Sequence, residues 1–250
     1  MNSALVFLAF AVVILSAGVN GEEYCARLLD ASTEVGWFAV NIDGTGRAAY
    51  AFHLDVTEVT FPATCFESKT VADGFNYHLH TLFDAGTVSP SQCGTTGGHY
   101  DPALACGPRS QNIATLCPSI NRDAASGYTY GCNPTVFANG DYNLCEVGDL
   151  SGKFGKALPL SANSNVFDSD VLLDPYAPLI NDYNSQSIVT LGWKSVNFHC
   201  QDTAGSRFLC AQFLPRDSSS PCPSISTSSA SAPFFALCSF IMMTLCCLLF

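Results

Sequence analysis

Basic residues are scarce in this chain of 250 residues. Lysine and arginine together number 10, against 21 aspartates and glutamates, so the formal net charge is −11 at pH 7. This balance argues against nucleic acid as a partner, because nucleic-acid binding needs a basic surface. An acidic surface also repels small anions at long range. An anionic substrate would therefore need a local positive charge at its binding site.

Amphipathic helix patterns and internal repeats are also missing. Short apolar or alternating runs, separated by turn residues, lie instead at 37–42, 48–56, 75–82, 187–199 and 208–214. Asp43-Gly44, between the first two runs, is typical of a β-hairpin. His53 in the second run is interpreted as an ordinary strand residue. Many short strands with frequent turns predict an all-β sandwich or barrel.

The central cysteines show no Cys-x-x-Cys pair, which argues against a thiolate zinc site. Ten cysteines lie between the apolar ends of the chain: Cys25, Cys65, Cys93, Cys106, Cys117, Cys132, Cys145, Cys200, Cys210 and Cys222. An even number in a secreted chain predicts up to five disulfides. Half of them fall in 86–145, a stretch rich in Gly, Ser, Asn and Pro. We expect this long loop to be tied down by disulfides rather than disordered.

Both ends of the chain have the character of processing signals. An apolar run followed by small residues predicts a signal peptide at 1–21, and the domain is expected at 22–215. A Ser-rich linker with the attachment region (216–232) and an apolar tail (233–250) are typical of a GPI-anchor signal. The alternative is a C-terminal membrane helix, although the tail is short for one and lacks basic residues beyond it. Either interpretation predicts a domain at the cell surface, outside the cell.

Histidines are few, and four of the five lie where strands or turns present side chains. In a strand, His78 and His80 point to one face and Leu79 to the other, so two imidazoles can meet at one point. His99 lies in a Gly-rich turn and His199 ends a predicted strand. Four neutral imidazoles suit copper or zinc, and a planar nitrogen set favours Cu(II). The alternative is a half-buried strand carrying solvated histidines.

Several segments, in order along the chain, resemble the copper/zinc superoxide dismutase family. The matching segments are His78-Leu79-His80, Cys93 with Gly97-Gly98-His99-Tyr100-Asp101-Pro102, 146–156, Val196-Asn197-Phe198-His199 and Gly205-Ser206-Arg207-Phe208-Leu209-Cys210. The similarity extends over about 24–213 and is greatest to the family's extracellular, GPI-anchored, copper-only branch. It implies a Greek-key antiparallel β-sandwich or flattened barrel of about eight strands with long disulfide-tied loops.

The resemblance also implies the identity of the metal ligands. Copper would be bound by the four histidines of these segments, His78, His80, His99 and His199. Zinc-containing relatives need two further histidines between His99 and Asp149, and this chain has none there. Copper without zinc is therefore expected, since one shared histidine and one carboxylate do not complete a zinc site.

The resemblance assigns roles to residues around the ligands as well. Glu146 would accept a hydrogen bond from His99 and fix its orientation, supported by Asp149. For both acids the alternative is loop capping and turn formation. Arg207 would attract the anion beside the copper, and Cys93 would be joined to Cys210. The nearby Lys153 and Lys156 are interpreted as exposed, solubilising residues, the alternative being that they add positive potential near the site.

The expected function is that of an extracellular copper-only superoxide dismutase, converting superoxide to oxygen and hydrogen peroxide. Arg207, Glu146 and His99 would act in catalysis, with His99 releasing reduced copper and helping to supply protons. The expected partners are the superoxide anion and, through a lipid anchor, the membrane. A monomer is favoured, with the oligomeric state left open. The alternatives are a surface copper-binding or interaction protein without turnover, and a disulfide-stapled structural domain without metal.

Overall fold

The computed structural model describes residues 21–43, 47–67, 69–83, 93–175, 194–202 and 205–227. The apolar tail, most of the predicted signal peptide and part of the predicted 187–199 strand lie outside these residues. Within them, no helix is long and apolar enough to cross a membrane. The expectations for the two ends of the chain therefore remain predictions.

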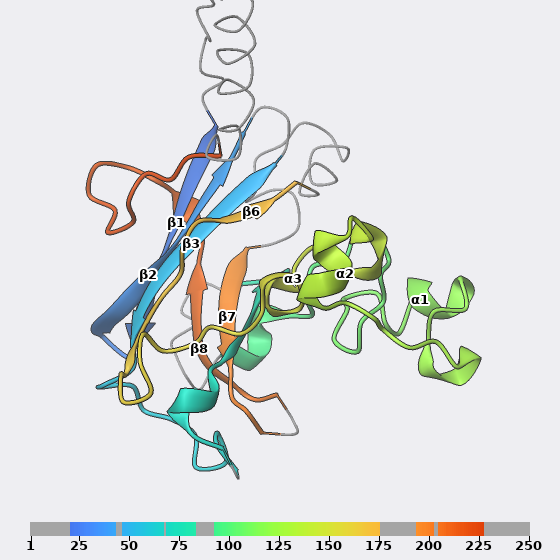
Figure 1. The fold of residues 1–250 in the computed structure, drawn as a ribbon, viewed down its shortest axis with the longest axis horizontal. Helices are drawn as coiled ribbons and strands as arrows, with labels where there is room; N and C mark the ends of the chain where they lie inside the picture. The colour runs from blue at the N-terminus through green and yellow to red at the C-terminus, as the bar shows by residue number, and fades with distance from the viewer. Residues whose placement is uncertain are drawn as a thin grey trace, which may run out of the picture.

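Antiparallel strands form two sheets in the described part of the chain (Figure 1). The larger sheet has the order β5-β3-β2-β1-β9, with β6 also paired to β3, and the smaller has the order β4-β7-β8. The strands are β1 (Glu22–Asp30), β2 (Thr33–Ile42), β3 (Ala48–Asp55), β4 (Asn76–His80), β5 (Val166–Asp168), β6 (Leu172–Asp174), β7 (Ser195–His199), β8 (Arg207–Gln212) and β9 (Leu214–Pro215). The predicted all-β sandwich is confirmed.

Among the described residues, helices are confined to single turns in the loops. They are η1 (Val71–Asp73), η2 (Cys93–Thr96), α1 (Leu116–Ser119), η3 (Ala124–Ser126), α2 (Pro134–Ala138), η4 (Tyr142–Leu144) and α3 (Leu150–Phe154). Most of them lie in the long cysteine-rich loop, which projects from one side of the sandwich in Figure 1. Cys106–Cys117 and Cys132–Cys145 cross-link this loop internally, in line with the expectation that disulfides hold it.

An aromatic core fills the space between the sheets. Phe38 and Phe52 come from the larger sheet and Tyr77 and Phe198 from the smaller one. Their ring centroids lie 5.2–6.3 Å apart in contacting pairs, and each ring is at most 3% exposed. Such aromatic contacts stabilise a core beyond the burial of their area. This core packs against one face of the smaller sheet. The candidate site lies on the opposite face.

The structured domain extends past residue 215, where we expected the linker to begin. Cys222 is joined to Cys25 in β1, and the side chain of Asn41 donates to the carbonyl of Ile225 (2.6 Å). Arg216 forms an ion pair with Glu23 (2.8 Å). A Ser-rich composition did not reveal these contacts, which depend on one cysteine, one arginine and one backbone carbonyl.

Lys153 differs from its prediction as an exposed residue. Its ammonium group is fully buried, 2.6 Å from an equally buried Asp174 carboxylate, and it also donates to the carbonyl of Val147 (2.9 Å). The ring of Phe137 lies 5.4 Å from the ammonium nitrogen. This ion pair fastens α3 to β6, because an unpaired buried charge would be strongly unfavourable. Lys156, three residues later, is exposed as predicted.

Candidate metal centre

The pairing of β4 with β7 places three histidines on one face of the smaller sheet. In this antiparallel register Asn76 lies opposite His199, and His78 opposite Asn197. Residues directly opposite each other share a face, and so do residues two apart in one strand. His78, His80 and His199 therefore point away from the core, while Leu79 is fully buried in it. As predicted, the two histidines of the His-x-His strand lie on one face and Leu79 lies on the other.

His99 reaches the same face through a loop hydrogen bonded to the outer edge of β4. The amide of Tyr100 donates to the carbonyl of Leu79 (3.0 Å), and the amide of Leu79 donates to the carbonyl of Gly148 (2.8 Å). Gly148 in turn donates to the carbonyl of Tyr100 (2.8 Å). These bonds join the His99 turn and the 146–150 segment to β4. They bring together segments that are far apart in the sequence.

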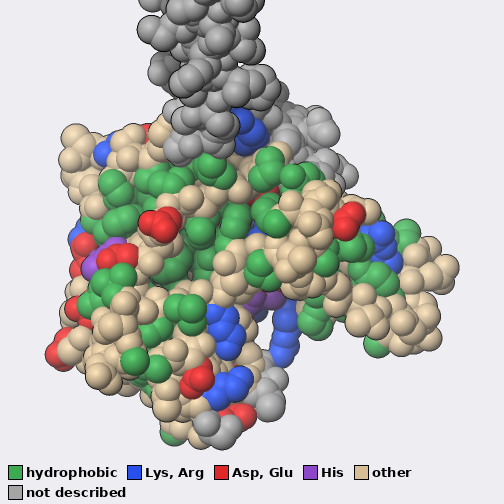
Figure 2. Space-filling view, viewed as in Figure 1, with side chains coloured by type: hydrophobic (Ala, Val, Ile, Leu, Met, Phe, Trp, Pro, Cys, Tyr) green, Lys and Arg blue, Asp and Glu red, His purple; other side chains and the backbone are tan. Residues whose placement is uncertain are grey.

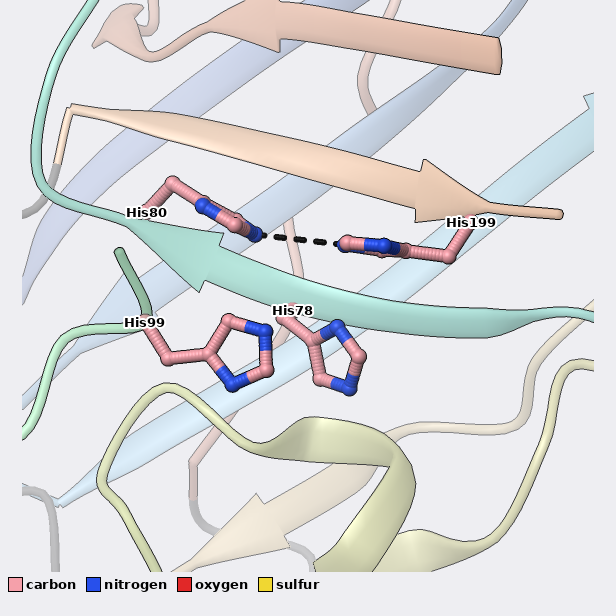
Figure 3. A group of neighbouring side chains, drawn as sticks. All are labelled: His78, His80, His99 and His199. Carbon is pink, nitrogen blue, oxygen red and sulfur yellow. Dashed lines mark hydrogen bonds between the residues drawn. The ribbon is translucent and has the colours of Figure 1, made fainter. Parts of the chain in front are cut away.

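The four rings meet at one point (Figure 3). One ligand nitrogen from each of His78, His80, His99 and His199 lies within 4.8 Å of the others. The Nε2 atoms of His80 and His199 are 3.3 Å apart, and the rings of His78 and His99 stack with centroids 4.0 Å apart. All four residues are less than 9% exposed. The structure thus brings together every histidine predicted for the site, whereas His53 lies elsewhere and contacts Asp168.

The opposite nitrogen of each ring has an acceptor. His80 Nδ1 donates to the carbonyl of Gly97 (3.0 Å) and His199 Nδ1 to the carbonyl of Gly205 (2.8 Å). Because a carbonyl only accepts, these bonds place the proton on Nδ1 and leave a lone pair on Nε2.

Carboxylates occupy the corresponding positions at the other two rings. His99 Nδ1 lies 2.7 Å from Glu146 Oε2, and His78 Nε2 lies 3.3 Å from Asp149 Oδ1. These contacts leave His78 Nδ1 and His99 Nε2 buried without a hydrogen-bond partner. Each of the four rings therefore has one held nitrogen and one nitrogen turned toward the shared point.

Burial keeps the four imidazoles uncharged. It lowers the pKa of His99 to about 4 and that of His80 and His199 well below the ordinary value. The pKa of His78 is also lowered, first by burial and then by the neighbouring His99. Neutral imidazole is the form that binds a metal ion. The four rings therefore have the protonation state that metal binding requires.

The two carboxylates beside the rings bring negative charge into a buried place. Burial raises the pKa of Glu146 well above its ordinary value, and the Coulombic effect of Asp149 adds to the rise. For Asp149 burial is the largest single effect and acts in the same direction. The hydrogen bond to His78, the Coulombic effects of His78 and His99 and the amide of Gly152 together outweigh burial and lower the pKa. A cation among the rings would compensate both acids, since a bound metal is the largest local charge in such a site.

Tyr130 joins the two acids and was not singled out in the sequence. Its hydroxyl donates to Asp149 Oδ2 (2.8 Å) and accepts the amide hydrogen of Glu146 (3.0 Å). It lies in the cysteine-rich loop, where no strand or helix periodicity predicts the direction in which a side chain points. The only available signal was its placement two residues before Cys132, a predicted disulfide cysteine.

Arg207 is held by the loop that the Cys93–Cys210 disulfide ties to β8. Its guanidinium donates to the carbonyls of Cys93 (2.9 Å) and Gly97 (2.6 Å) and to Thr96 Oγ1 (3.0 Å). The Gly97 carbonyl also accepts from His80 Nδ1, so arginine and histidine share one acceptor. Coulombic repulsion from Arg207 is among the causes that lower the pKa of His80 and His99.

An open groove of about 480 Å³ leads to the histidines. His78, His99 and His199 line it, together with Arg109 and Lys156. Figure 2 shows histidine atoms in a hollow with Lys and Arg side chains near them. Arg109 is a second arginine at the site, and we missed it in the sequence. The signal that could have found it is a basic residue ten positions after His99 in an acidic chain.

The residues present fit a metal ion. Ligand bonds of imidazole nitrogen to such metals are about 2.0–2.1 Å, which puts opposite nitrogens about 4 Å apart. The four nitrogens all lie within 4.8 Å of one another, which is close to this spacing. The second group of metal-ligand residue types in the described residues is Asp101, Cys106 and Cys117. Its cysteines are joined in a disulfide, so the histidine cluster is the better candidate.

Comparisons with known proteins give a likeness to solved structures only. No protein-family model matches the chain, and no curated protein matches it. The chain is similar to superoxide dismutase 5 of Candida albicans in its Cu(II) form, with 18% identity and a TM-score of 0.46, covering 82% of this chain and 99% of that one. Two single-residue variants of that protein are similar at 17% identity, with TM-scores of 0.46 and 0.44 and the same coverage.

Proposed function

We propose that this protein is an extracellular superoxide dismutase that uses copper and no zinc. The observation that carries the proposal is the convergence of four neutral imidazole nitrogens, each with its opposite nitrogen held by an acceptor. Nitrogen ligands of this kind suit copper. The five disulfides among the described residues are typical of a protein exposed to an oxidising environment. We further propose a lipid anchor, on the sequence of the C-terminal segment.

His78, His80, His99 and His199 would hold the metal. The chemistry that bound copper supplies is one-electron exchange, by which one superoxide is oxidised to oxygen and a second, with two protons, is reduced to hydrogen peroxide. Glu146 holds His99 through Nδ1, so that Nε2 is the atom able to carry either a metal or a proton. Asp149 holds His78 in the same way through Nε2. This arrangement fixes the rings before substrate arrives.

The absence of zinc is part of the proposal and rests on the partners of His99 and Asp149. A zinc ion shared through His99 would bind its Nδ1, but Glu146 lies 2.7 Å from that atom. The carboxylate of Asp149 is engaged by His78, Tyr130 and the amide of Gly152. These contacts leave no set of four ligands at that place among the described residues.

Positive charge near the rings favours an anionic substrate. Arg207 is held beside His80, and Arg109 and Lys156 line the groove, in a chain that is strongly acidic overall. Fixed positive charges at a groove raise the local concentration of anions. The two acids in the same lining, Glu146 and Asp149, are engaged by His99 and His78. Superoxide is small enough to reach the rings along this path.

The test is to load the purified protein with copper, measure its metal content and follow superoxide consumption by stopped flow. We expect stoichiometric copper and rapid consumption, and a rate at least tenfold lower for His78→Ala. The matched control is His53→Ala, which removes a histidine on the other sheet and should leave the rate unchanged. Stoichiometric copper without superoxide consumption would reject the enzyme and favour the alternative of a surface copper-binding protein.

A further inference from the structure

One hydroxyl group connects the two acids that hold the candidate ligands. Tyr130 Oη lies 2.8 Å from Asp149 Oδ2 and 3.0 Å from the amide nitrogen of Glu146. An amide N–H can only donate, so Tyr130 Oη accepts there and its own hydrogen points to Asp149. The hydroxyl thus uses both its donor and an acceptor function at this one place.

The connection runs from one ligand ring to another. Asp149 contacts His78 and Glu146 contacts His99, and these two rings stack on each other at 4.0 Å. Tyr130 closes this chain through its hydrogen bonds to the two acids. Its influence on a metal would therefore pass through these acids.

The loop around Tyr130 holds the hydroxyl in place. The Cys132–Cys145 disulfide joins the residue two positions after Tyr130 to the residue just before Glu146. Gly107 packs against both side chains, because a carbon added there would collide with Glu146 Oε1 and crowd Tyr130 Cζ. The position of the hydroxyl is therefore set by covalent and steric constraints as well as by its hydrogen bonds.

The hydroxyl of Tyr130 also stabilises the negative charge of Asp149. Asp149 is buried and its oxygens accept from Tyr130, from Gly152 and at His78. Each donor stabilises negative charge on that carboxylate and weakens its demand for the His78 proton. Burial, followed by the Coulombic effect of Asp149, raises the pKa of Tyr130, so the hydroxyl remains a donor at all ordinary pH values.

We propose that Tyr130 is a positioning residue of the metal centre, which sets the orientation and donor strength of His78 and His99 through Asp149 and Glu146. This inference rests on the proposed copper site and extends it by one residue beyond the acids. Outer hydrogen-bond partners of metal-bound histidines commonly change metal affinity 10–100-fold when removed. The cysteine-rich loop that carries Tyr130 would thereby influence the metal affinity of the centre.

The test compares Tyr130→Phe with Tyr128→Phe in the copper-loaded protein. Tyr128 lies in the same loop, and its hydroxyl donates to the carbonyl of Ala105 (2.7 Å), away from the acids. Each variant therefore loses one hydroxyl and keeps its ring. Copper affinity by competition with a chelator, the EPR spectrum of Cu(II) and the reduction potential are measured for both and for the wild type.

We expect Tyr130→Phe to weaken copper affinity at least tenfold and to shift both the copper hyperfine splitting and the potential. Tyr128→Phe should match the wild type in all three. A second variant, Cys132→Ser with Cys145→Ser, keeps the hydroxyl but frees the loop and should shift the spectrum in the same direction. Wild-type spectra and affinities in all these variants would overturn the inference and leave the proposed function standing. A wild-type protein that takes up no copper would overturn both.

Discussion

At the scale of single residues, the partner of each ring decides what that ring can do. Two rings are held by backbone carbonyls and two by carboxylates. A carbonyl fixes only the tautomer, whereas a carboxylate also adds negative charge next to the ring. His99 and His78 should therefore depend on their partners more than His80 and His199 do.

Replacing Glu146 with Gln should weaken the metal centre without unfolding the protein. The amide keeps the shape of the side chain, but the negative charge next to His99 is lost, so we expect copper affinity to fall about 10–100-fold. Equilibrium dialysis of the purified variant measures this fall. Asp168→Asn is the matched control, because Asp168 holds the exposed His53 by an equivalent contact of 2.6 Å. Equal affinities for wild type and Glu146→Gln would contradict the role assigned to the acid.

Metal uptake should remain strong in mildly acidic solution. An exposed histidine has a pKa of about 6.5 and is mostly protonated at pH 5. Burial lowers the pKa of His99 to about 4 and lowers that of the other three rings, so these groups take up protons at lower pH than an exposed histidine does. Copper affinity measured at pH 7 and pH 5 should change little. A steep loss of affinity centred near pH 6.5 would show that the rings titrate as exposed histidines.

At the scale of elements, the longer alternating strands were predictable, whereas the short strands β5, β6 and β9 and the course of the long loop were not. The His-x-His strand and the 37–42/48–56 hairpin follow from alternation and from Asp-Gly, and the described structure contains both. Tyr130 and Arg109 come from the cysteine-rich loop, whose path is set by disulfides and side-chain contacts rather than by local periodicity. Lys153 was misjudged because its partner Asp174 lies on a separate strand. Pairing of distant residues leaves no local pattern.

The buried Lys153–Asp174 ion pair should be essential for stability. Lys153→Met removes the positive charge next to a buried carboxylate, which lowers the free energy of unfolding by about 3–5 kcal/mol. Chemical denaturation of the metal-free protein measures the loss. Lys156→Met, at an exposed position three residues away, should change stability by no more than about 0.5 kcal/mol.

Removing both partners of this pair provides the decisive comparison. Lys153→Met combined with Asp174→Leu fills the same space with apolar groups, so much of the lost stability should return. A double variant as unstable as Lys153→Met alone would show that packing around the lysine, and not its charge, holds α3 to β6.

At the scale of the whole molecule, an acidic protein presents a groove whose lining includes two basic residues. The net charge of −11 repels an anion, while Arg109 and Lys156 at the groove attract it. Composition predicted this need for a local positive charge and the family resemblance pointed to Arg207. Added positive potential was the alternative interpretation of Lys156, whereas Arg109 was not singled out. The Debye length is about 8–10 Å in ordinary buffers, so only charges near the groove retain their effect there.

Replacing Arg109 and Lys156 together with Gln should slow the reaction with superoxide by about 2–10-fold at low salt, because electrostatic attraction along the groove is lost. The wild-type rate should fall as salt is added, and the variant rate should fall less. Stopped-flow rates over a range of ionic strength measure both. Arg27→Gln combined with Arg47→Gln, which also removes two positive charges, is the control for net charge, because both arginines are exposed, outside the groove lining and paired with Glu34 and Asp43. Identical salt dependence in all three proteins would exclude steering by these residues.

The central claim is that four histidine nitrogens form one copper site. The most direct measurement is the EPR spectrum of the protein with one equivalent of Cu(II), recorded with the metal content of the same sample. We predict one copper per chain and hyperfine splitting from several nitrogens, with a different nitrogen pattern in His199→Ala. Substoichiometric copper, or a spectrum without nitrogen splitting that His199→Ala leaves unchanged, would contradict the claim.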